Sequence, residues 1–149
     1  MHIQQSERDA GEMAEMKRLI AEAMDDGAWG LSSGLIFSPG VYASTEELIE
    51  LCQVPAERGG YYFTHIRGED EHLLDALAEA IQIGEHVGVA VQIAHLKTFE
   101  PENWPLLDRA LALIDDARAR DVDLAADRYP YAASSTNLAG RLPPWSRDG

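Results

Sequence analysis

The sequence predicts an α/β fold built around a parallel sheet. Apolar residues recur at helical spacing in four segments of the chain, and a short run rich in apolar residues follows each segment. This alternation repeats at a spacing of about 30 to 40 residues, which is typical of βα units. Four βα units therefore account for the pattern. The pattern alone leaves open whether the units form a doubly wound sheet or part of a barrel.

Local signals justify each element in order. Gly27 ends the first predicted helix, and Ser44 with Glu47 three residues later forms a capping-box pattern at the start of the second. Because Pro55 has no backbone N–H, we expect it to distort the last turn of this second helix. In chain order, the predicted elements are a helix at 12–26, a strand at 29–36, a helix between 44 and 59, a strand at 61–65, a helix at 69–87, a strand at 89–95, a helix at 102–120 and a strand at 122–127.

Length and charge limit the classes of protein to consider. A closed (β/α)₈ barrel usually needs about 250 residues, so 149 residues suit only part of one. No linker-like tract divides the chain, which predicts one domain over residues 1–149. The formal charge of −14 disfavours nucleic acid and anionic membranes as partners. The sequence shows neither a membrane-spanning run nor a signal-peptide pattern, so we expect a cytoplasmic protein.

The single cysteine, Cys52, falls on the predicted second helix. It cannot form an internal disulfide, and its neighbours Leu48, Ile49 and Leu51 indicate an apolar helical face. We therefore expect Cys52 to be buried, distant from the strand-end histidines described next, and neither reactive nor bound to metal.

Two histidines occupy equivalent places at the ends of predicted strands. His65 and His95 each end an apolar strand, and a cation follows two residues later in each case, Arg67 and Lys97. Because the carboxyl ends of parallel strands form one functional face, the two histidines should lie side by side there. Neutral imidazole is a good zinc ligand, so a shared metal is the functional interpretation. The alternative is that each histidine only makes hydrogen bonds within the domain.

Several short motifs follow one another in an order that is specific as a set, from about Met13 to Trp145. They are GLSSGLI at 30–36, THIR at 64–67, QIAHLK at 92–97, NW at 103–104, DRYPY at 127–131, ST at 135–136 and LPPW at 142–145. On these motifs the chain resembles the N-acyl-D-amino-acid deacylases (D-aminoacylases), a family of the amidohydrolase superfamily.

The resemblance implies a fold, a cofactor and a reaction. The fold is a partial (β/α)₈ TIM-type barrel, in which this chain supplies approximately strands four to seven. The cofactor is zinc, with His65 and His95 as the ligands on strands five and six. The reaction hydrolyses the acyl amide of an N-acyl-D-amino acid to a carboxylate and a free D-amino acid. The zinc would make hydroxide available near neutral pH and polarise the amide carbonyl.

Three further residues are candidates for binding the substrate carboxylate. By the resemblance, Lys97 and Tyr129 match positions beside the substrate, and Arg67 lies two residues past the first histidine. The alternative is that Arg67 and Lys97 pair only with neighbouring acidic residues. Asp127 fits either a partner of the site or a turn residue. Phe37 stands where family members commonly have a tyrosine, which removes one hydroxyl near the substrate.

Other parts of the family's site are absent from this sequence. The His-x-His pair of strand one is missing, and we expect the general-base aspartate to lie beyond Gly149, so no catalytic residue is assigned here. Cys52 does not match the cysteine that the family presents earlier in its barrel. Two imidazoles cannot complete a four-coordinate zinc site. We therefore expect a domain truncated at both ends and inactive alone.

Two alternatives stay open. A cyclic amidohydrolase such as a dihydroorotase or hydantoinase shares the two strand-end histidines but typically has a carboxylated lysine at the end of strand four, and no lysine lies between Gly30 and Gly40. The other alternative is a non-catalytic, oligomeric half barrel. Four apolar parallel strands leave two unpaired edges, which favours self-association or pairing with a complementing barrel fragment.

Overall fold

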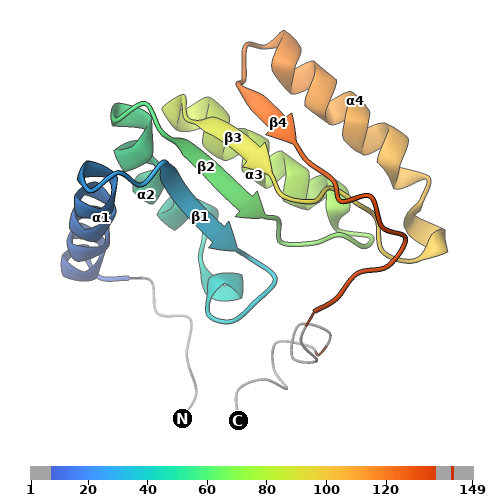
Figure 1. The fold of residues 1–149 in the computed structure, drawn as a ribbon, viewed down its shortest axis with the longest axis horizontal. Helices are drawn as coiled ribbons and strands as arrows, with labels where there is room; N and C mark the ends of the chain where they lie inside the picture. The colour runs from blue at the N-terminus through green and yellow to red at the C-terminus, as the bar shows by residue number, and fades with distance from the viewer. Residues whose placement is uncertain (1–7, 137–141, 143–149) are drawn as a thin grey trace.

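The computed structural model describes residues 8–136 and residue 142, and it confirms the predicted α/β class with parallel strands. Helices and strands alternate along the described chain (Figure 1). The elements are α1 (Ala10–Asp25), β1 (Gly30–Gly34), the short 3₁₀ helix η1 (Gly40–Tyr42), α2 (Thr45–Glu57), β2 (Tyr61–His65), α3 (Leu73–Val87), β3 (Ala90–Ile93), the 3₁₀ helix η2 (Pro101–Asn103), α4 (Leu106–Ala119) and β4 (Leu124–Ala126).

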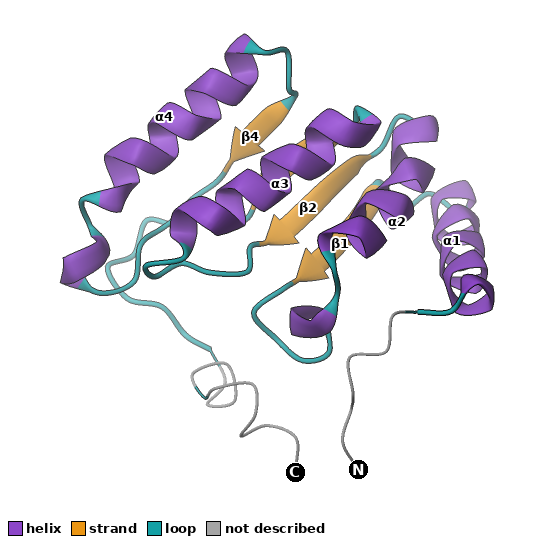
Figure 2. Ribbon diagram, turned by 180° about the vertical axis from the view of Figure 1, so that it is seen from behind, coloured by secondary structure: helices purple, strands orange, loops and turns teal. Residues whose placement is uncertain are grey.

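The four strands form one parallel sheet in the order β1-β2-β3-β4. Helices α2, α3 and α4 all lie on the same face of this sheet (Figure 2). A doubly wound sheet reverses its strand order at a switch point and carries helices on both faces, whereas a barrel wall keeps sequential order with helices outside. The topology therefore decides the question that the sequence pattern left open, in favour of part of a barrel.

The core lies between the sheet and these helices. Alternate residues of β2 and β3 point into it: Tyr62, Thr64 and Ile93 have no exposed surface, and Val91 is 2% exposed. The other face of the sheet carries half-buried residues such as Phe63 and Gln92. Within the described residues, β1 and β4 each pair along one edge only. No helix in the described part of the chain is long and apolar enough to cross a membrane.

Several predicted boundaries differ from the structure, and three of the differences have a local reason. Helix α3 begins at Leu73 and not at residue 69, because residues 66–72 form a turning segment after β2. Pro101 and Pro105 divide the predicted helix at 102–120 into η2 and α4. Strand β3 ends at Ile93, so the chain turns before it reaches His95. This last difference changes how the second histidine is held.

Cys52 is fully buried on α2, as predicted, within the apolar cluster that joins α2 to the sheet. Burial raises the pKa of its thiol from the ordinary value of 9.0 to about 12. As the pH rises, the thiol ionises at a lower pH in the unfolded chain than in the folded chain. The contribution of Cys52 to the free energy of unfolding is therefore complete below about pH 9 and is lost as the pH rises towards 12.

We therefore expect the free energy of unfolding to fall by about 1 kcal/mol between pH 8 and pH 10 because of Cys52. Urea denaturation across this pH range measures it. A Cys52→Ala variant starts less stable but should show a flatter profile over the same range. Equal slopes for the two proteins would contradict the assignment.

Candidate metal centre

The structure brings together the two histidines that the sequence singled out. His65 is the last residue of β2, and His95 lies two residues after the end of β3, the neighbouring parallel strand. Nδ1 of His65 and Nε2 of His95 are 2.8 Å apart, and the two rings meet edge to face with centroids 4.5 Å apart. Without a metal, one nitrogen must carry the proton that the other accepts. A metal ion bound by both would replace that proton.

The fit to a metal rests on this separation and on the kind of donor atoms that meet here. Two imidazole nitrogens bound to one tetrahedral zinc are about 3.3 Å apart, so a shift of about half an ångström would admit the ion. Among the described residues, two buried side-chain polar atoms lack a hydrogen-bond partner, Nε2 of His65 and Oε2 of Glu69. Within the described part of the chain, potential ligand atoms of His65, Glu69 and His95 lie within 4.8 Å of one another, and Cys52 does not belong to this cluster.

Electrostatics keep His65 in the form that binds metal. Burial, followed by the charges of His95 and Lys97, lowers the pKa of His65 to about 4. The ring is therefore neutral at pH 7 and retains a lone pair for coordination. The ring of Phe37 lies against His65 with centroids 5.1 Å apart, and this apolar contact helps to exclude water from the imidazole. Phe37, where the family commonly has tyrosine, is thus an apolar contact of the first histidine.

His95 is held in an unusual backbone conformation. Its φ is 38°, in the left-handed region that non-glycine residues rarely adopt. Asp127, just past β4, stabilises this turn: its Oδ1 accepts the backbone N–H of His95 at 2.7 Å and its Oδ2 accepts from Gln92 at 2.9 Å. The backbone carbonyl of Asp127 also accepts the N–H of Leu96. Asp127 therefore supports the placement of His95 through its backbone N–H and does not occupy the ring nitrogens of His95.

A buried carboxylate that the sequence reasoning missed lies beside His95. Glu69, in the segment between β2 and α3, is 2% exposed. Its Oε1 lies 3.1 Å from Nδ1 of His95 and 2.5 Å from Nζ of Lys97. Lys97, which the sequence predicted to bind substrate, therefore forms an ion pair with Glu69 and lies near the candidate metal ligand His95. An acidic residue four positions after a strand-end histidine gives no signal by itself, because 26 residues of this chain are acidic.

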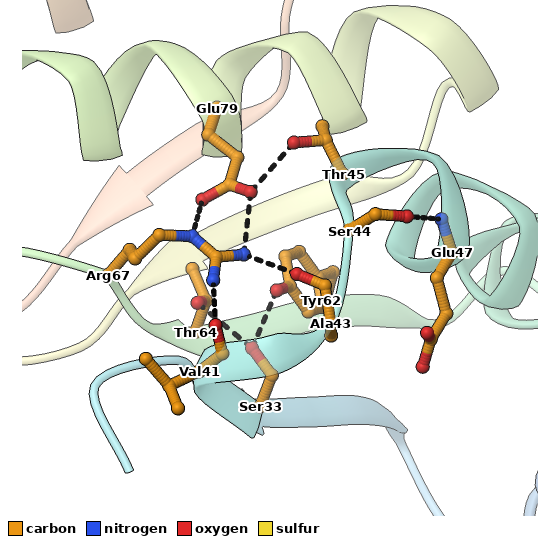
Figure 3. Close-up of polar contacts among 10 residues, drawn as sticks. All are labelled: Ser33, Val41, Ala43, Ser44, Thr45, Glu47, Tyr62, Thr64, Arg67 and Glu79. Atoms are coloured by element: carbon orange, nitrogen blue, oxygen red, sulfur yellow. Dashed lines mark hydrogen bonds and ion pairs between the residues drawn. The ribbon is translucent and has the colours of Figure 1, made fainter. Parts of the chain in front are cut away.

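Arg67 lies elsewhere in the same cleft, and Figure 3 shows its contacts. Its guanidinium makes a bidentate ion pair with Glu79 of α3, at 3.0 and 2.9 Å. It also donates to the carbonyls of Val41 and Ala43, both at 2.9 Å. Thr45 donates to the same Glu79 carboxylate. These contacts tie the segment before α2 to α3, so most of the N–H groups of Arg67 already have protein partners.

Tyr129 and Lys97 complete one wall of a cleft of about 800 Å³ at the carboxyl ends of the strands. The Tyr129 ring lies 6.3 Å from the His95 ring, and Nζ of Lys97 lies 5.6 Å from the Tyr129 ring. Both histidines, Arg67 and Glu69 line the same cleft. All five predicted site residues thus face one space large enough for a small substrate.

Sequential βα units with two histidines at adjacent strand ends define a segment of a (β/α)₈-type barrel with a candidate metal site at the carboxyl ends of its strands. No family model matches the chain. The chain is 43% identical over 127 residues to a D-aminoacylase from Alcaligenes xylosoxydans xylosoxydans. The aligned region covers 85% of this chain and 26% of the relative. The predicted resemblance to the N-acyl-D-amino-acid deacylases is confirmed for this segment.

Solved structures agree with this assignment. The N-acyl-D-glutamate deacylase from Bordetella bronchiseptica, determined with zinc and a phosphonate inhibitor, superposes with a TM-score of 0.83 at 37% identity, over 88% of this chain and 28% of that one. An L-hydantoinase from Arthrobacter aurescens gives a TM-score of 0.54 at 20% identity, over 81% of this chain and 30% of that one, which supports the shared fold alone. The chain spans about a quarter of the length of the relatives that it matches.

Proposed function

We propose that this chain supplies the part of a zinc-dependent N-acyl-D-amino-acid deacylase barrel that carries two zinc ligands, His65 and His95. The observation that carries the proposal is the 2.8 Å approach of Nδ1 of His65 to Nε2 of His95 at adjacent strand ends. Likeness to enzymes described as D-aminoacylase and N-acyl-D-glutamate deacylase supports the substrate class. The weaker likeness to a hydantoinase gives the cyclic amidohydrolase alternative no comparable support.

The chain's own residues would hold the metal and the substrate. His65 and His95 offer ring nitrogens as ligands, and when bound the zinc would supply a water of lowered pKa and polarise the amide carbonyl. Lys97 and Tyr129 stand at the wall of the cleft, where an ammonium and a phenol would receive the carboxylate of an N-acyl-D-amino acid. Lys97 retains a 13% exposed side chain although Glu69 pairs with it.

Ligand counting predicts that the 149-residue polypeptide binds zinc weakly and has no deacylase activity. Zinc sites in enzymes use three protein ligands, and hydrolysis also needs a proton acceptor beside the bound water. Incubation with zinc and N-acetyl-D-methionine, followed by an amine assay, should give no product above background. Efficient zinc-dependent turnover by this polypeptide would contradict the proposal.

Reconstitution gives the positive test. The chain should replace the corresponding segment of the Alcaligenes D-aminoacylase, or complement the remaining segments on co-expression, and restore zinc-dependent hydrolysis. The matched control is the same scaffold without this chain, which should be inactive. A soluble, folded chimera that binds no zinc would show that the site is wrongly assigned.

A further inference from the structure

The loop between β1 and α2, residues 35–44, forms an apolar side of the cleft. It contains η1 and contributes Ile36, Phe37 and Val41 to the lining of the cleft. These three side chains are called the apolar wall below. The ring of Phe37 also lies 5.1 Å from the ring of His65. The position of this loop therefore shapes the cleft on the side of the first histidine.

Close backbone contacts fold this loop onto the end of β1. The N–H of Phe37 donates to the carbonyl of Gly34 at 3.3 Å, and the N–H of Val41 donates to the carbonyl of Phe37 at 2.8 Å. A Cβ on Gly40 would lie only 2.6 Å from the carbonyl oxygen of Gly34. Since this distance is shorter than real Cβ contacts, any larger residue at position 40 would displace the loop.

Arg67 holds the other end of the loop against α3 (Figure 3). It donates to the carbonyls of Val41 and Ala43, both at 2.9 Å. Its Nε and Nη2 donate to the carboxylate of Glu79, which also accepts from Thr45. These bonds use four of the five guanidinium N–H groups. Arg67 therefore keeps too few donors for a bidentate contact with a substrate carboxylate.

The polar and apolar walls of the cleft lie beside different histidines. Tyr129 and Lys97 lie near His95, with 6.3 Å between the two ring centroids and 2.9 Å from Nζ of Lys97 to Nδ1. Phe37 lies against His65. In an N-acyl-D-amino acid, the amide carbon joins the acyl chain on one side to the nitrogen that leads to the carboxylate on the other. With the carboxylate at the polar wall and the amide between the histidines, the acyl chain reaches the apolar wall.

We propose that Arg67 is a positioning residue that sets the choice of acyl group, because it holds the apolar wall beside His65. The inference rests on the proposed function for the kind of substrate and for the place of its carboxylate. Arg67 acts through the loop whose carbonyls it binds and does not touch the acyl chain. Apolar groups that leave water against this wall stabilise the bound substrate and its transition state.

Amide hydrogen exchange of the metal-free polypeptide tests whether Arg67 holds the loop. Arg67→Lys keeps a positive charge beside Glu79, but one ammonium cannot reproduce a planar fork that reaches the carboxylate and both carbonyls. The amide of Val41, bonded to the carbonyl of Phe37, should then exchange about tenfold faster relative to the amide of Val91, bonded within the sheet. The ratio of the two rates removes any general loss of stability, because global unfolding exposes both amides.

Kinetics in the reconstituted barrel test whether the wall selects the acyl group. N-butyryl-D-methionine and N-formyl-D-methionine carry the same carboxylate and differ in their acyl chains. Arg67→Lys should lower the ratio of kcat/KM for the butyryl over the formyl substrate about three- to tenfold, because each CH₂ group that loses apolar contact costs about fourfold. Gly40→Ala should lower the same ratio, since it displaces the same loop and leaves Arg67 in place.

Arg120→Lys is the matched control for both measurements. Arg120 also pairs with a glutamate of α3, because its Nη2 lies 2.8 Å from Oε1 of Glu85. This pair is exposed, and neither residue lines the cleft. The same substitution should therefore change neither the exchange ratio of Val41 nor the selectivity between acyl groups. Changes as large as those in Arg67→Lys would indicate a general effect of arginine loss and overturn the proposal.

The outcomes separate this inference from the proposed function. Equal losses of kcat/KM for both substrates in Arg67→Lys would refute the proposal, because a residue that binds the carboxylate affects both substrates alike. A lowered ratio in Gly40→Ala but not in Arg67→Lys would keep the wall and refute the role of Arg67. An unchanged exchange ratio for Val41 in folded Arg67→Lys would refute it as well. If the barrel with the unsubstituted chain hydrolyses neither substrate, the proposed function fails, and the exchange ratio still decides whether Arg67 holds the loop.

Discussion

In a barrel reconstituted with this chain, His65→Ala or His95→Ala should lower kcat/KM for an N-acyl-D-amino acid by about a thousandfold or more. The two nitrogens lie 2.8 Å apart at adjacent strand ends, so removing either ring removes half of the ligands that the chain offers. A thousandfold loss corresponds to about 4 kcal/mol of transition-state stabilisation, a reasonable magnitude for disrupting a catalytic zinc site. Kinetics together with the zinc content of each purified variant measure the effect.

The matched control for these two variants is His86→Ala. His86 lies in the last turn of α3 and is exposed, so its loss should change neither zinc content nor kcat/KM. Retention of full activity and zinc by His65→Ala or His95→Ala would show that the metal is bound elsewhere in the barrel. A loss of zinc in His86→Ala would indicate a general effect of histidine removal on folding.

Replacing Arg67 with methionine should lower the free energy of unfolding of the chain by about 2 to 3 kcal/mol. Breaking a buried ion pair costs about 3 to 5 kcal/mol, and this pair is partly exposed, which reduces the effect. The variant leaves Glu79 unpaired and removes the hydrogen bonds to the carbonyls of Val41 and Ala43 (Figure 3). Urea denaturation with circular dichroism measures the change.

Arg18→Met is the control for Arg67→Met, because Arg18 pairs with Glu15 and Glu22 on the exposed surface of α1 and its loss should leave stability nearly unchanged. A third variant, Arg67→Lys, tests the prediction that Arg67 binds the substrate carboxylate. In the reconstituted barrel, this variant should raise KM if Arg67 binds the substrate. A destabilised chain with an unchanged KM in Arg67→Lys would assign Arg67 to the link between the segment before α2 and α3.

Much of the fold could be read from local patterns. Strand β2 matches its predicted bounds, because Gly59 and Gly60 end the preceding segment and Tyr61-Tyr62-Phe63 suits a strand. The helix predicted at 69–87 begins four residues late, since residues 69–72 turn to bring Glu69 into the cleft. Hydrophobic periodicity indicates which residues share one face of a helix or strand, but it does not predict a turn that contacts with distant segments stabilise.

The amino-acid order was enough to establish the four βα units, the burial of Cys52 and the two histidines at successive strand ends, because each depends on a local helix or strand pattern that repeats along the chain. Tertiary structure decided which atoms meet. The pairing of Glu69 with Lys97 joins residues 28 positions apart, and the support of His95 by Asp127 joins residues 32 apart. Such contacts arise from the sheet register and loop packing, which bring together side chains whose polar partners no local pattern specifies.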